Sequence, residues 1–262
     1  MPLLKDIYYF DNGGNGNRPP VILIHGAGGT HLYWPPEIRR LKNQHILAID
    51  LPGHGKSSGI GKQSIADYGH SVMDFMQSLK INKAIFIGHS MGGAIALWLG
   101  IHHPASTLGL GLVSTSSRLR VSPLLLSTSS THATMPLAVK ALVELSFGSQ
   151  IDSRTKELSA QRLGETRHTV LHGDFTACSA FDESKQAGKI KCPVLILCGN
   201  EDQMTPVKFS EDLHAGIKKS RLEIIQGAGH MVMLEKPLQT AGHLESFLND
   251  IPYQPGSSSI TE

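Results

Sequence analysis

Short apolar runs alternate with helix-like segments along most of this chain, and this alternation constrains its fold more than any other feature. A first run, Ile7–Phe10, is followed by six others: Val21–His25, His45–Ile49, Ala84–Gly88, Leu108–Ser114, Val194–Cys198 and Leu222–Ile225. Helical patterns lie between them, at Ser64–Leu79, Met91–His102, Pro206–Ala215 and Pro237–Asn249. Alternating strands and helices are typical of βαβ units, and buried parallel strands read as unbroken apolar runs, as VILI, AIFI and VLIL do here. The pattern predicts an α/β fold with a mostly parallel sheet.

One long interval departs from this alternation. After the strand that ends near Ser114, about seventy residues pass without a strand pattern, and Met135–Phe147 and Ser153–His168 have helical patterns. We therefore predict a twisted sheet of about seven strands flanked by helices, with a helical cap inserted after the sixth strand. The core would comprise residues 1–117 and 190–252, and the cap residues 118–189. The Pro-, Gly- and Ser-rich tail, 253–262, is expected to be disordered.

Composition narrows the class of protein. The 262 residues, of which 40% are hydrophobic, can bury one large core. A formal net charge of +2 without a basic stripe gives no support for a nucleic-acid or membrane partner. The N-terminal stretch lacks the basic start and long apolar run of a signal peptide, and Cys178, Cys192 and Cys198 are not spaced as metal ligands. We expect a cytoplasmic monomer or homodimer that uses no metal and no cofactor.

Ser90 stands in the motif that carries the most chemistry. The run Ala84–Ile87 leads into Gly88-His89-Ser90-Met91-Gly92, and a predicted helix begins directly after the serine. This is G-x-S-x-G at a strand–turn–helix junction, where a sharp turn lifts the serine hydroxyl above the end of the strand. The context predicts that Ser90 is a nucleophile and that the Met91 N–H, at the helix N-terminus, faces a developing oxyanion. The pentapeptide alone is a weak motif, and a serine that only closes a turn is the alternative.

A serine hydroxyl needs a base, and position selects one of the fourteen histidines. His230 ends a glycine-rich loop after the last predicted strand, at the strand's carboxyl end, where the sites of α/β proteins gather. Asp202 follows the preceding strand and is the predicted orienting carboxylate, with its neighbour Glu201 as the alternative. The chain order of serine, acid and histidine is the one expected with this motif. Other polar groups near the site are predicted to be structural: His25, His54 and Asp50.

The loop after Val21–Ile24 supplies the second predicted oxyanion donor. Its sequence, His25-Gly26-Ala27-Gly28-Gly29, has small residues that let a substrate approach the backbone closely. The N–H of Ala27 is the predicted donor, with that of Gly28 in reserve. A phosphate-binding loop is the alternative, but neither a G-x-G-x-x-G pattern nor a following lysine is present. Gly28, His89 and Met231 flank these groups and are predicted to contact the substrate.

With these residues identified, the chain resembles the α/β-hydrolase superfamily, in its small bacterial carboxylesterase and enol-lactonase-like branch. Five motifs stand in the family's order and span nearly the whole core: HGAGG, DLPGHGKS, GHSMGG, GNEDQMTP and GAGHMVMLEKP. The resemblance implies Ser90 as nucleophile, Asp202 as acid and His230 as base, with an oxyanion hole formed by the N–H groups of Ala27 and Met91. It also implies that Arg118 to about Lys189 is a cap over the site. The additional first strand of the family has no counterpart in the pattern.

The residues at positions 90 and 231 distinguish among the classes of enzyme that the resemblance allows. Haloalkane dehalogenases and epoxide hydrolases carry Asp where Ser90 stands, and C–C hydrolases commonly carry Trp where Met231 stands. Hydrolysis of carboxylic esters with small or medium apolar groups, through an acyl-enzyme, is the predicted function. The alternatives are an enol-lactonase, a C–C bond hydrolase of aromatic degradation and, from another class, a non-catalytic ligand receptor.

The predicted cap offers residues for both kinds of substrate. Three arginines could contact the carboxylate that an enol-lactonase substrate carries: Arg154, Arg162 and Arg167. Apolar side chains are available to line a pocket: Met135, Leu142, Val143, Leu145, Phe147, Phe175 and Phe181. We expect those that face the site to favour apolar esters.

Overall fold

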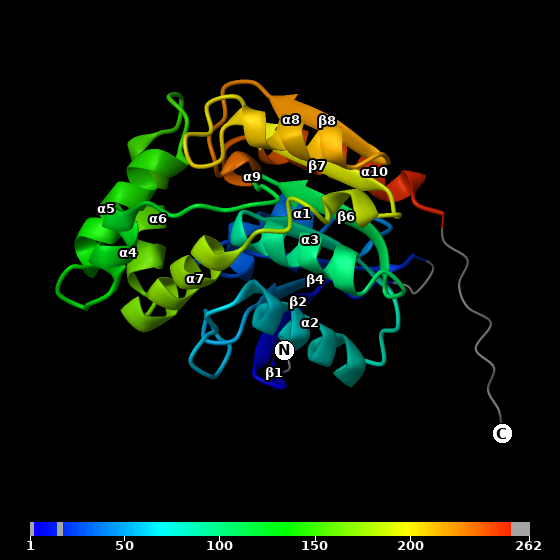
Figure 1. Cartoon of the computed structure of the whole chain (residues 1–262), viewed down its shortest axis with the longest axis horizontal. Coiled ribbons are helices and arrows are strands. Elements are labelled where there is room, and N and C mark those ends of the chain that lie inside the picture. The colour runs from blue at the N-terminus through cyan, green and yellow to red at the C-terminus, as the bar shows by residue number, and fades with distance from the viewer. Residues whose placement is uncertain (1–2, 15–17, 253–262) are drawn as a thin grey trace.

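A twisted sheet with helices on both faces forms the core of the computed structural model, which describes residues 3–14 and 18–252 (Figure 1). Within these residues the strands stand in the order β1-β2-β4-β3-β5-β6-β7-β8. β2 pairs with β1 and β4 in antiparallel register, and all other neighbours are parallel. The strands are Leu3–Leu4, Ile7–Asp11, Pro20–Ile24, His45–Asp50, Ala84–His89, Thr107–Val113, Val194–Gly199 and Ser220–Ile225 for β1 to β8.

The helices fall into those that cover the sheet and those of the insertion between β6 and β7. The first group comprises α1 (Pro36–Arg39), α2 (Ile65–Ser78), α3 (Met91–His102), α8 (Val207–Gly216), α9 (Val232–Glu235) and α10 (Pro237–Asp250). The insertion comprises α4 (Pro123–Ser129), α5 (Met135–Ser146), α6 (Ser153–Gly164) and α7 (His168–Ala180). Two 3₁₀ turns, His31–Tyr33 and Ala187–Lys189, complete the described helices. In Figure 1 the insertion extends to one side of the sheet, beyond the ends of its strands.

Alternate residues of the central strands supply the two halves of the core. On β3, Ile22 and Ile24 pack in the cluster that contains α2 and α3, whereas Val21 and Leu23 pack in the cluster that contains α1 and α10. All four side chains are fully buried. In a parallel strand covered by helices on both faces, polar and apolar residues therefore do not alternate. This explains the continuous apolar runs in the sequence.

The strand order reverses beside β3, which positions the site. β3 pairs with β4 on one edge and with β5 on the other, so the connections after β3 and β5 leave in opposite directions. In open α/β sheets a crevice forms at such a switch point, outside the carboxyl ends of the strands. The loop that begins at His25 and the turn at Ser90 both lie at this edge.

The structure confirms the predicted α/β fold, with one addition. All seven predicted strands are present, and the two-residue strand β1, which was not predicted, makes eight in the described part of the chain. The helical insertion lies between β6 and β7, which is after the sixth strand when β1 is counted and after the fifth of the seven predicted runs. The predicted helix Ser153–His168 is divided, because α6 ends at Gly164 and α7 begins at His168. The core and cap boundaries at 118 and 189 stay a prediction, and the predicted disordered tail lies outside the described residues.

None of the helices in residues 3–14 and 18–252 combines the length and apolar character that a membrane span requires.

Candidate active site

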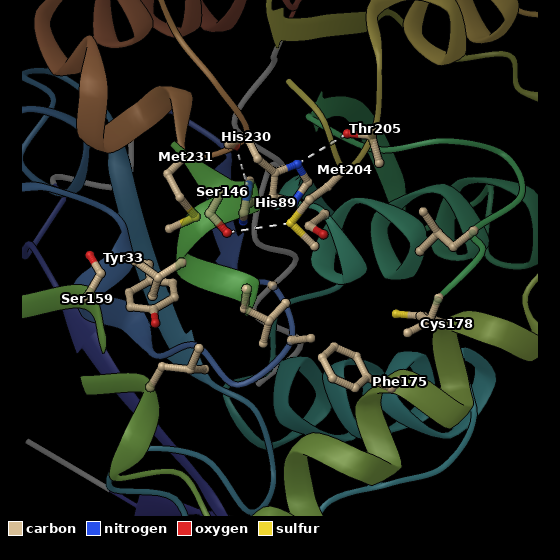
Figure 2. Close-up of a pocket in the computed structure, with 18 of the residues that line it drawn as sticks. Tyr33, His89, Ser146, Ser159, Phe175, Cys178, Met204, Thr205, His230 and Met231 are labelled. Carbon is tan, nitrogen blue, oxygen red and sulfur yellow. Dashed lines mark hydrogen bonds between the residues drawn. The ribbon is translucent and has the colours of Figure 1, made fainter. Parts of the chain in front are cut away.

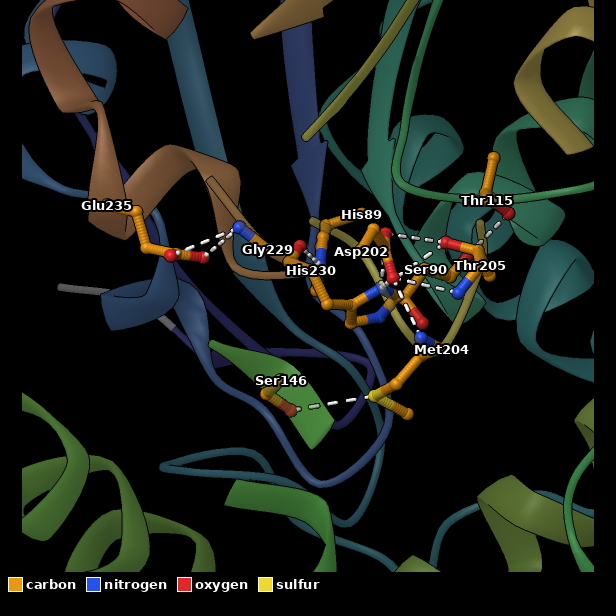
Figure 3. Close-up of polar contacts among 10 residues, drawn as sticks. All are labelled: His89, Ser90, Thr115, Ser146, Asp202, Met204, Thr205, Gly229, His230 and Glu235. Atoms are coloured by element: carbon orange, nitrogen blue, oxygen red, sulfur yellow. Dashed lines mark hydrogen bonds and ion pairs between the residues drawn. The ribbon is translucent and has the colours of Figure 1, made fainter. Parts of the chain in front are cut away.

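Ser90 occupies a sharp turn between β5 and α3. Its backbone is in the left-handed region, with φ 54° and ψ −117°, a conformation that costs a non-glycine residue about 1–3 kcal/mol. Two contacts hold it: the Ser90 N–H donates to the Val113 carbonyl at 2.9 Å, and Thr115 Oγ1 donates to the Ser90 carbonyl at 2.8 Å (Figure 3). Strain held in place by neighbouring strands is typical of a functional position.

The two glycines of the motif allow the turn to close. A Cβ atom on Gly88 would lie 1.9 Å from the Gly92 carbonyl oxygen, and one on Gly92 would lie 2.2 Å from the Ile24 carbonyl oxygen. No side chain fits at either distance. The G-x-S-x-G pattern is therefore required by the close approach of β3, β5 and α3.

His230 and Asp202 form a buried pair at the carboxyl ends of β8 and β7. His230 Nδ1 lies 2.9 Å from Asp202 Oδ2 and 3.1 Å from Oδ1 (Figure 3). Only 3% of His230 and 5% of Asp202 is exposed. An ionised carboxylate accepts only, so the hydrogen of the neutral ring is assigned to Nδ1, which leaves Nε2 with a free lone pair.

The Asp202 carboxylate is prepared for this contact by its own loop. Its Oδ1 accepts hydrogen bonds from the N–H groups of Met204 at 2.9 Å and Thr205 at 2.8 Å, and its Oδ2 accepts one from Thr205 Oγ1 at 2.8 Å. Burial raises the pKa of Asp202, but His230 and the Thr205 hydrogen bonds lower it by more than burial raises it. The net pKa therefore lies below its ordinary value. The carboxylate is thus ionised at neutral pH. Sequence reasoning missed Thr205, although its position three residues after the acid is typical of such a turn.

Glu201, the alternative acid, points elsewhere. Its Oε2 accepts a hydrogen bond from the N–H of Ser149, in the insertion, at 2.6 Å. Asp202 and not Glu201 therefore contacts His230.

Ser90 and His230 line one pocket, which we call the Ser90 pocket (Figure 2). Ala27, His89 and Met231 also line it, so three further predicted site residues lie at this place. The walls are mainly apolar and come from the core and the insertion alike: Tyr33, Leu119, Val121, Leu142, Val143, Phe147, Leu163, Phe175 and Met204. Of the seven apolar cap residues predicted to be available for a pocket, four line it: Leu142, Val143, Phe147 and Phe175. Met135 and Phe181 pack in hydrophobic clusters, and Leu145 is exposed.

The two predicted oxyanion donors differ in their surroundings. Ala27 lines the Ser90 pocket, and Met91 begins α3 with its side chain fully buried in the core. Neither N–H donates to a partner within residues 3–14 and 18–252. Free N–H groups at a helix start and in a glycine-rich loop are suited to bind an oxyanion.

Gly28, predicted as the reserve oxyanion donor and as a substrate contact, has another partner in the structure. Its N–H donates to Asp174 Oδ2 at 2.8 Å and so is not a free oxyanion donor. Gly28 also packs against Leu163 and is not among the residues that line the Ser90 pocket. The sequence could not reveal this, because the carboxylate is 146 residues away.

His89 supports the main chain of His230. Its ring is buried, and its Nε2 lies 2.9 Å from the His230 carbonyl oxygen, so Nε2 is assigned as the donor. Burial lowers the pKa of His89 to about 3, which keeps the ring neutral. Its Nδ1 is then an acceptor, and it has no partner in the described chain. His89 also lines the Ser90 pocket, and its contact with a substrate stays a prediction.

The insertion is anchored to the His230 loop at two points. Glu235 accepts hydrogen bonds from the Gly148 N–H at 2.8 Å and, with both of its oxygens, from the Gly229 N–H at 3.0 and 3.1 Å. The Met231 N–H donates to the Ser146 carbonyl at 3.0 Å. The end of α5 and the histidine loop are therefore held together.

The cap arginines proposed for a substrate carboxylate lie away from the Ser90 pocket. Arg154 pairs with Glu157 at 3.6 Å, and Arg167 donates to the carbonyls of Gly53 and Gly59. Arg162 lines a separate surface hollow with Arg167. Arg120, which sequence reasoning did not single out, is the one Lys or Arg among the residues that line the Ser90 pocket.

The three polar groups predicted to be structural all make such contacts. Asp50 accepts from the N–H groups of His31 at 2.6 Å and Lys56 at 3.0 Å. His25 Nε2 accepts from the Leu51 N–H at 3.0 Å, and burial lowers the pKa of His25 to about 4.

His54 belongs to a buried ion pair beside the loop that contains Ala27 and Gly28. Its Nε2 lies 2.8 Å from Asp174 Oδ2 and its Nδ1 lies 3.2 Å from the Pro52 carbonyl oxygen. Burial lowers the pKa of His54, but Asp174 and the Pro52 carbonyl raise it by more, so the net pKa lies above its ordinary value. Because both ring nitrogens face acceptors, the ring is assigned as the imidazolium.

This pair predicts a pH dependence of stability. The folded-state pKa of His54 is raised, so its contribution is complete below the unfolded value of about 6.5 and is lost as pH rises through the raised pKa. We expect the free energy of unfolding of the wild type to fall, relative to that of His54→Gln, over this interval. The groups that face the ring are Asp174, His25, Asp50 and Tyr68. Urea unfolding at a series of pH values measures the difference, and two parallel pH curves would contradict the assignment.

Comparison with known proteins agrees with this architecture. The model of the alpha/beta hydrolase family matches residues 21–243. The chain is 27% identical to 3-oxoadipate enol-lactonase 1 of Acinetobacter baylyi over 91% of each chain, and 28% identical to monoacylglycerol lipase ABHD6 of Rattus norvegicus over 93% of this chain and 79% of the lipase.

Solved structures give the same result. A thermophilic esterase is 33% identical, with a TM-score of 0.81 over 94% of both chains. The enol-lactonase from Burkholderia xenovorans LB400 is 24% identical, with a TM-score of 0.87 over 93% of this chain and 96% of its own, and shows the same fold. With a family model that covers most of its length and hydrolase relatives in both comparisons, the chain belongs to the alpha/beta hydrolase family.

Proposed function

We propose that the protein hydrolyses carboxylic esters, with Ser90 as nucleophile, His230 as general base and Asp202 as the carboxylate that orients it. The observation that carries this proposal is the buried pair of His230 and Asp202, 2.9 Å apart, on the same pocket as a serine in a strained turn. The thermophilic esterase among the similar structures supports the same class of reaction.

The proposed reaction uses each group in turn. Ser90 Oγ attacks the ester carbonyl carbon while its proton passes to His230 Nε2, and the oxyanion binds the N–H groups of Ala27 and Met91. Collapse of this intermediate breaks the bond to the leaving alcohol, which takes the proton from His230. A water molecule, deprotonated by the same ring, then attacks the acyl carbon. The bond to Ser90 Oγ breaks, Oγ takes the proton back from His230, and the acid is released. These steps need no metal and no cofactor.

The pocket supports small or medium apolar acyl groups. Its walls from the insertion are aliphatic or aromatic, among them Leu142, Val143 and Phe175. A panel of 4-nitrophenyl esters with acyl chains of increasing length tests this proposal. We expect turnover that declines once the chain exceeds the pocket. A wild-type protein that turns over no ester, yet is stabilised by a small molecule, would instead be a ligand receptor.

One observation favours a second candidate, the hydrolysis of esters or lactones that carry a carboxylate. Arg120 is exposed, lines the mainly apolar Ser90 pocket and has no ion-pair partner among the described residues. A guanidinium at this place would attract an anionic group at the far end of an acyl chain. The similarity to 3-oxoadipate enol-lactonase 1 gives independent support.

Arg120→Gln tests this second candidate. We expect kcat/KM for mono-4-nitrophenyl glutarate to fall about fivefold, as for an exposed ion pair, and that for 4-nitrophenyl pentanoate to stay unchanged. Arg118→Gln is the matched control, because Arg118 is on the same segment but pairs with Asp182 at 3.2 Å. Equal effects of Arg120→Gln on both esters would remove the support for an anionic substrate.

The remaining expectations stay predictions: a cytoplasmic location, a monomeric or homodimeric state, and no nucleic-acid or membrane partner. A C–C bond hydrolase of aromatic degradation stays an alternative with little support, because Met231 stands where such enzymes commonly carry Trp.

A further inference from the structure

The tip of the proposed oxyanion loop is held by the insertion. The Gly28 N–H donates to Asp174 Oδ2 of α7 at 2.8 Å, and the Gly28 carbonyl accepts from Thr166 Oγ1, between α6 and α7, at 2.9 Å. A Cβ atom on Gly28 would lie 2.5 Å from Leu163 Cδ1 and 3.0 Å from Leu171 Cδ1. Both polar groups and the open face of Gly28 therefore contact the insertion.

These contacts select one form of the loop. The Gly29 N–H donates to the Gly26 carbonyl at 3.0 Å, so Ala27 and Gly28 are the two central residues of a β-turn. Gly28 has φ +64°, which is the sign that a type II turn requires at this position. Type I and type II turns differ by a flip of the central peptide, and the Gly28 N–H belongs to that peptide. A flip would aim the Ala27 carbonyl at the Asp174 carboxylate, so the negative charge opposes it.

The selected turn leaves the proposed oxyanion donor free. The Ala27 N–H precedes the central peptide, has no hydrogen-bond partner in the described part of the chain, and belongs to a residue on the Ser90 pocket. The peptide that carries this N–H and the central peptide share the Cα atom of Ala27. Contacts that hold the central peptide in place therefore also limit displacement of the peptide that carries the donor.

Asp174 is itself rigidly placed. Asp174 is fully buried. Its Oδ1 accepts a hydrogen bond from the Tyr68 hydroxyl of α2 at 2.6 Å, and its Oδ2 also lies 2.8 Å from His54 Nε2. The imidazolium of His54 compensates the buried charge. One carboxylate thus joins α7 to α2, to the loop after β4 and to the oxyanion loop.

We propose that Asp174, assisted by Thr166, is a positioning residue for the oxyanion site, so that the insertion contributes to transition-state stabilisation as well as to the pocket wall. This inference rests on the proposed function, because it assigns a task to the Ala27 N–H. Two contacts are assigned to positioning, those of Asp174 and Thr166 with Gly28. The Tyr68 hydroxyl donates to the other oxygen of the Asp174 carboxylate, and this contact is assigned a structural role only.

The test compares Asp174→Asn and Thr166→Val with Tyr68→Phe as the matched control. We expect Asp174→Asn to lower kcat for a 4-nitrophenyl ester about 10- to 100-fold, and Thr166→Val about 3- to 10-fold, with KM nearly unchanged. Both should weaken inhibition by an alkyl trifluoromethyl ketone, whose adduct carries an oxyanion, by a factor similar to the loss of kcat. Tyr68→Phe should lower the melting temperature but keep kcat within about twofold.

Each outcome decides between the two proposals. If the wild type hydrolyses esters and both Gly28-contact variants keep kcat and inhibitor affinity, whatever their melting temperatures, the positioning role is overturned and the proposed function stands. A fall in kcat with Tyr68→Phe as large as with Asp174→Asn would reduce Asp174 to a structural role and overturn it too. If Asp174→Asn does not fold, Thr166→Val, which buries no unpaired charge, carries the test alone. A wild type inert toward every ester removes the proposed function and this inference together.

Discussion

Replacement of Ser90 by Ala should abolish ester hydrolysis while the fold is retained. The side chain that is lost supplies the attacking oxygen, and no other hydroxyl group shares its place at the end of β5. In serine hydrolases with a complete triad, loss of the nucleophile lowers kcat by about 10⁶-fold, and we expect a loss of at least about 10⁴-fold here. The measurement is the turnover of 4-nitrophenyl butyrate at saturating substrate.

The same variant should be at least as stable as the wild type. Ala is a smaller non-glycine residue in the same left-handed turn, with φ 54° in the wild type, so the backbone strain is nearly unchanged. A suitable control is Ser159→Ala, because Ser159 also lines the Ser90 pocket but lies on α6, away from the turn. Comparable losses of activity in both variants would indicate a general effect on the pocket and speak against a nucleophile at residue 90.

The second large effect is expected at Asp202. In Asp202→Asn the shape is kept, but the amide cannot hold the neutral His230 ring with its hydrogen on Nδ1 and cannot stabilise the imidazolium. The equivalent replacement in a serine protease triad lowers kcat by about 10⁴-fold, and we expect about 10³- to 10⁴-fold. The fold should persist, because Asn Oδ1 can still accept from the Met204 and Thr205 N–H groups.

Glu201→Gln is the matched control for this variant, since the two acids are adjacent. Glu201 contacts the Ser149 N–H and should contribute only to the anchorage of the insertion, so kcat is expected to change less than about threefold. Activity that survives Asp202→Asn but is lost in Glu201→Gln would transfer the orienting role to Glu201.

The fold was predictable where burial on both faces leaves a continuous apolar run. β3, β5 and β7 are strands of this kind, and the helix predicted over Met91–His102 has the bounds of α3. β1 was not predictable, because its two residues form no pattern and only its pairing with β2 defines it. The break between α6 and α7 was missed although the sequence contains a signal for it, because α6 ends at Gly164 and glycine is common where helices end.

The candidate site divides in the same way. The strand–turn–helix context led to Ser90, and the loops after the later strands led to His230 and Asp202. Sequence position alone could not decide whether Asp202 or Glu201 contacts His230. The decision depends on which carboxylate accepts hydrogen bonds from the Met204 and Thr205 N–H groups.

Contacts with the insertion were the least predictable part of the site. Gly28 was assigned to the substrate because nothing in the sequence connects it with Asp174. One signal was present, however. Asp174 is the only acidic residue in the helix His168–Ala180, and a carboxylate in a buried helix requires a partner.

The central claim, that Ser90 is the attacking residue, is tested most directly by covalent labelling with a fluorophosphonate. Its phosphorus accepts the activated serine oxygen and loses fluoride, which leaves a stable adduct that peptide mapping by mass spectrometry can locate. We expect one adduct, on the peptide that contains Gly88–Gly92, with a parallel loss of esterase activity and no adduct in Ser90→Ala. An adduct on another residue that accompanies the loss of activity, or full inhibition without an adduct at Ser90, would contradict it.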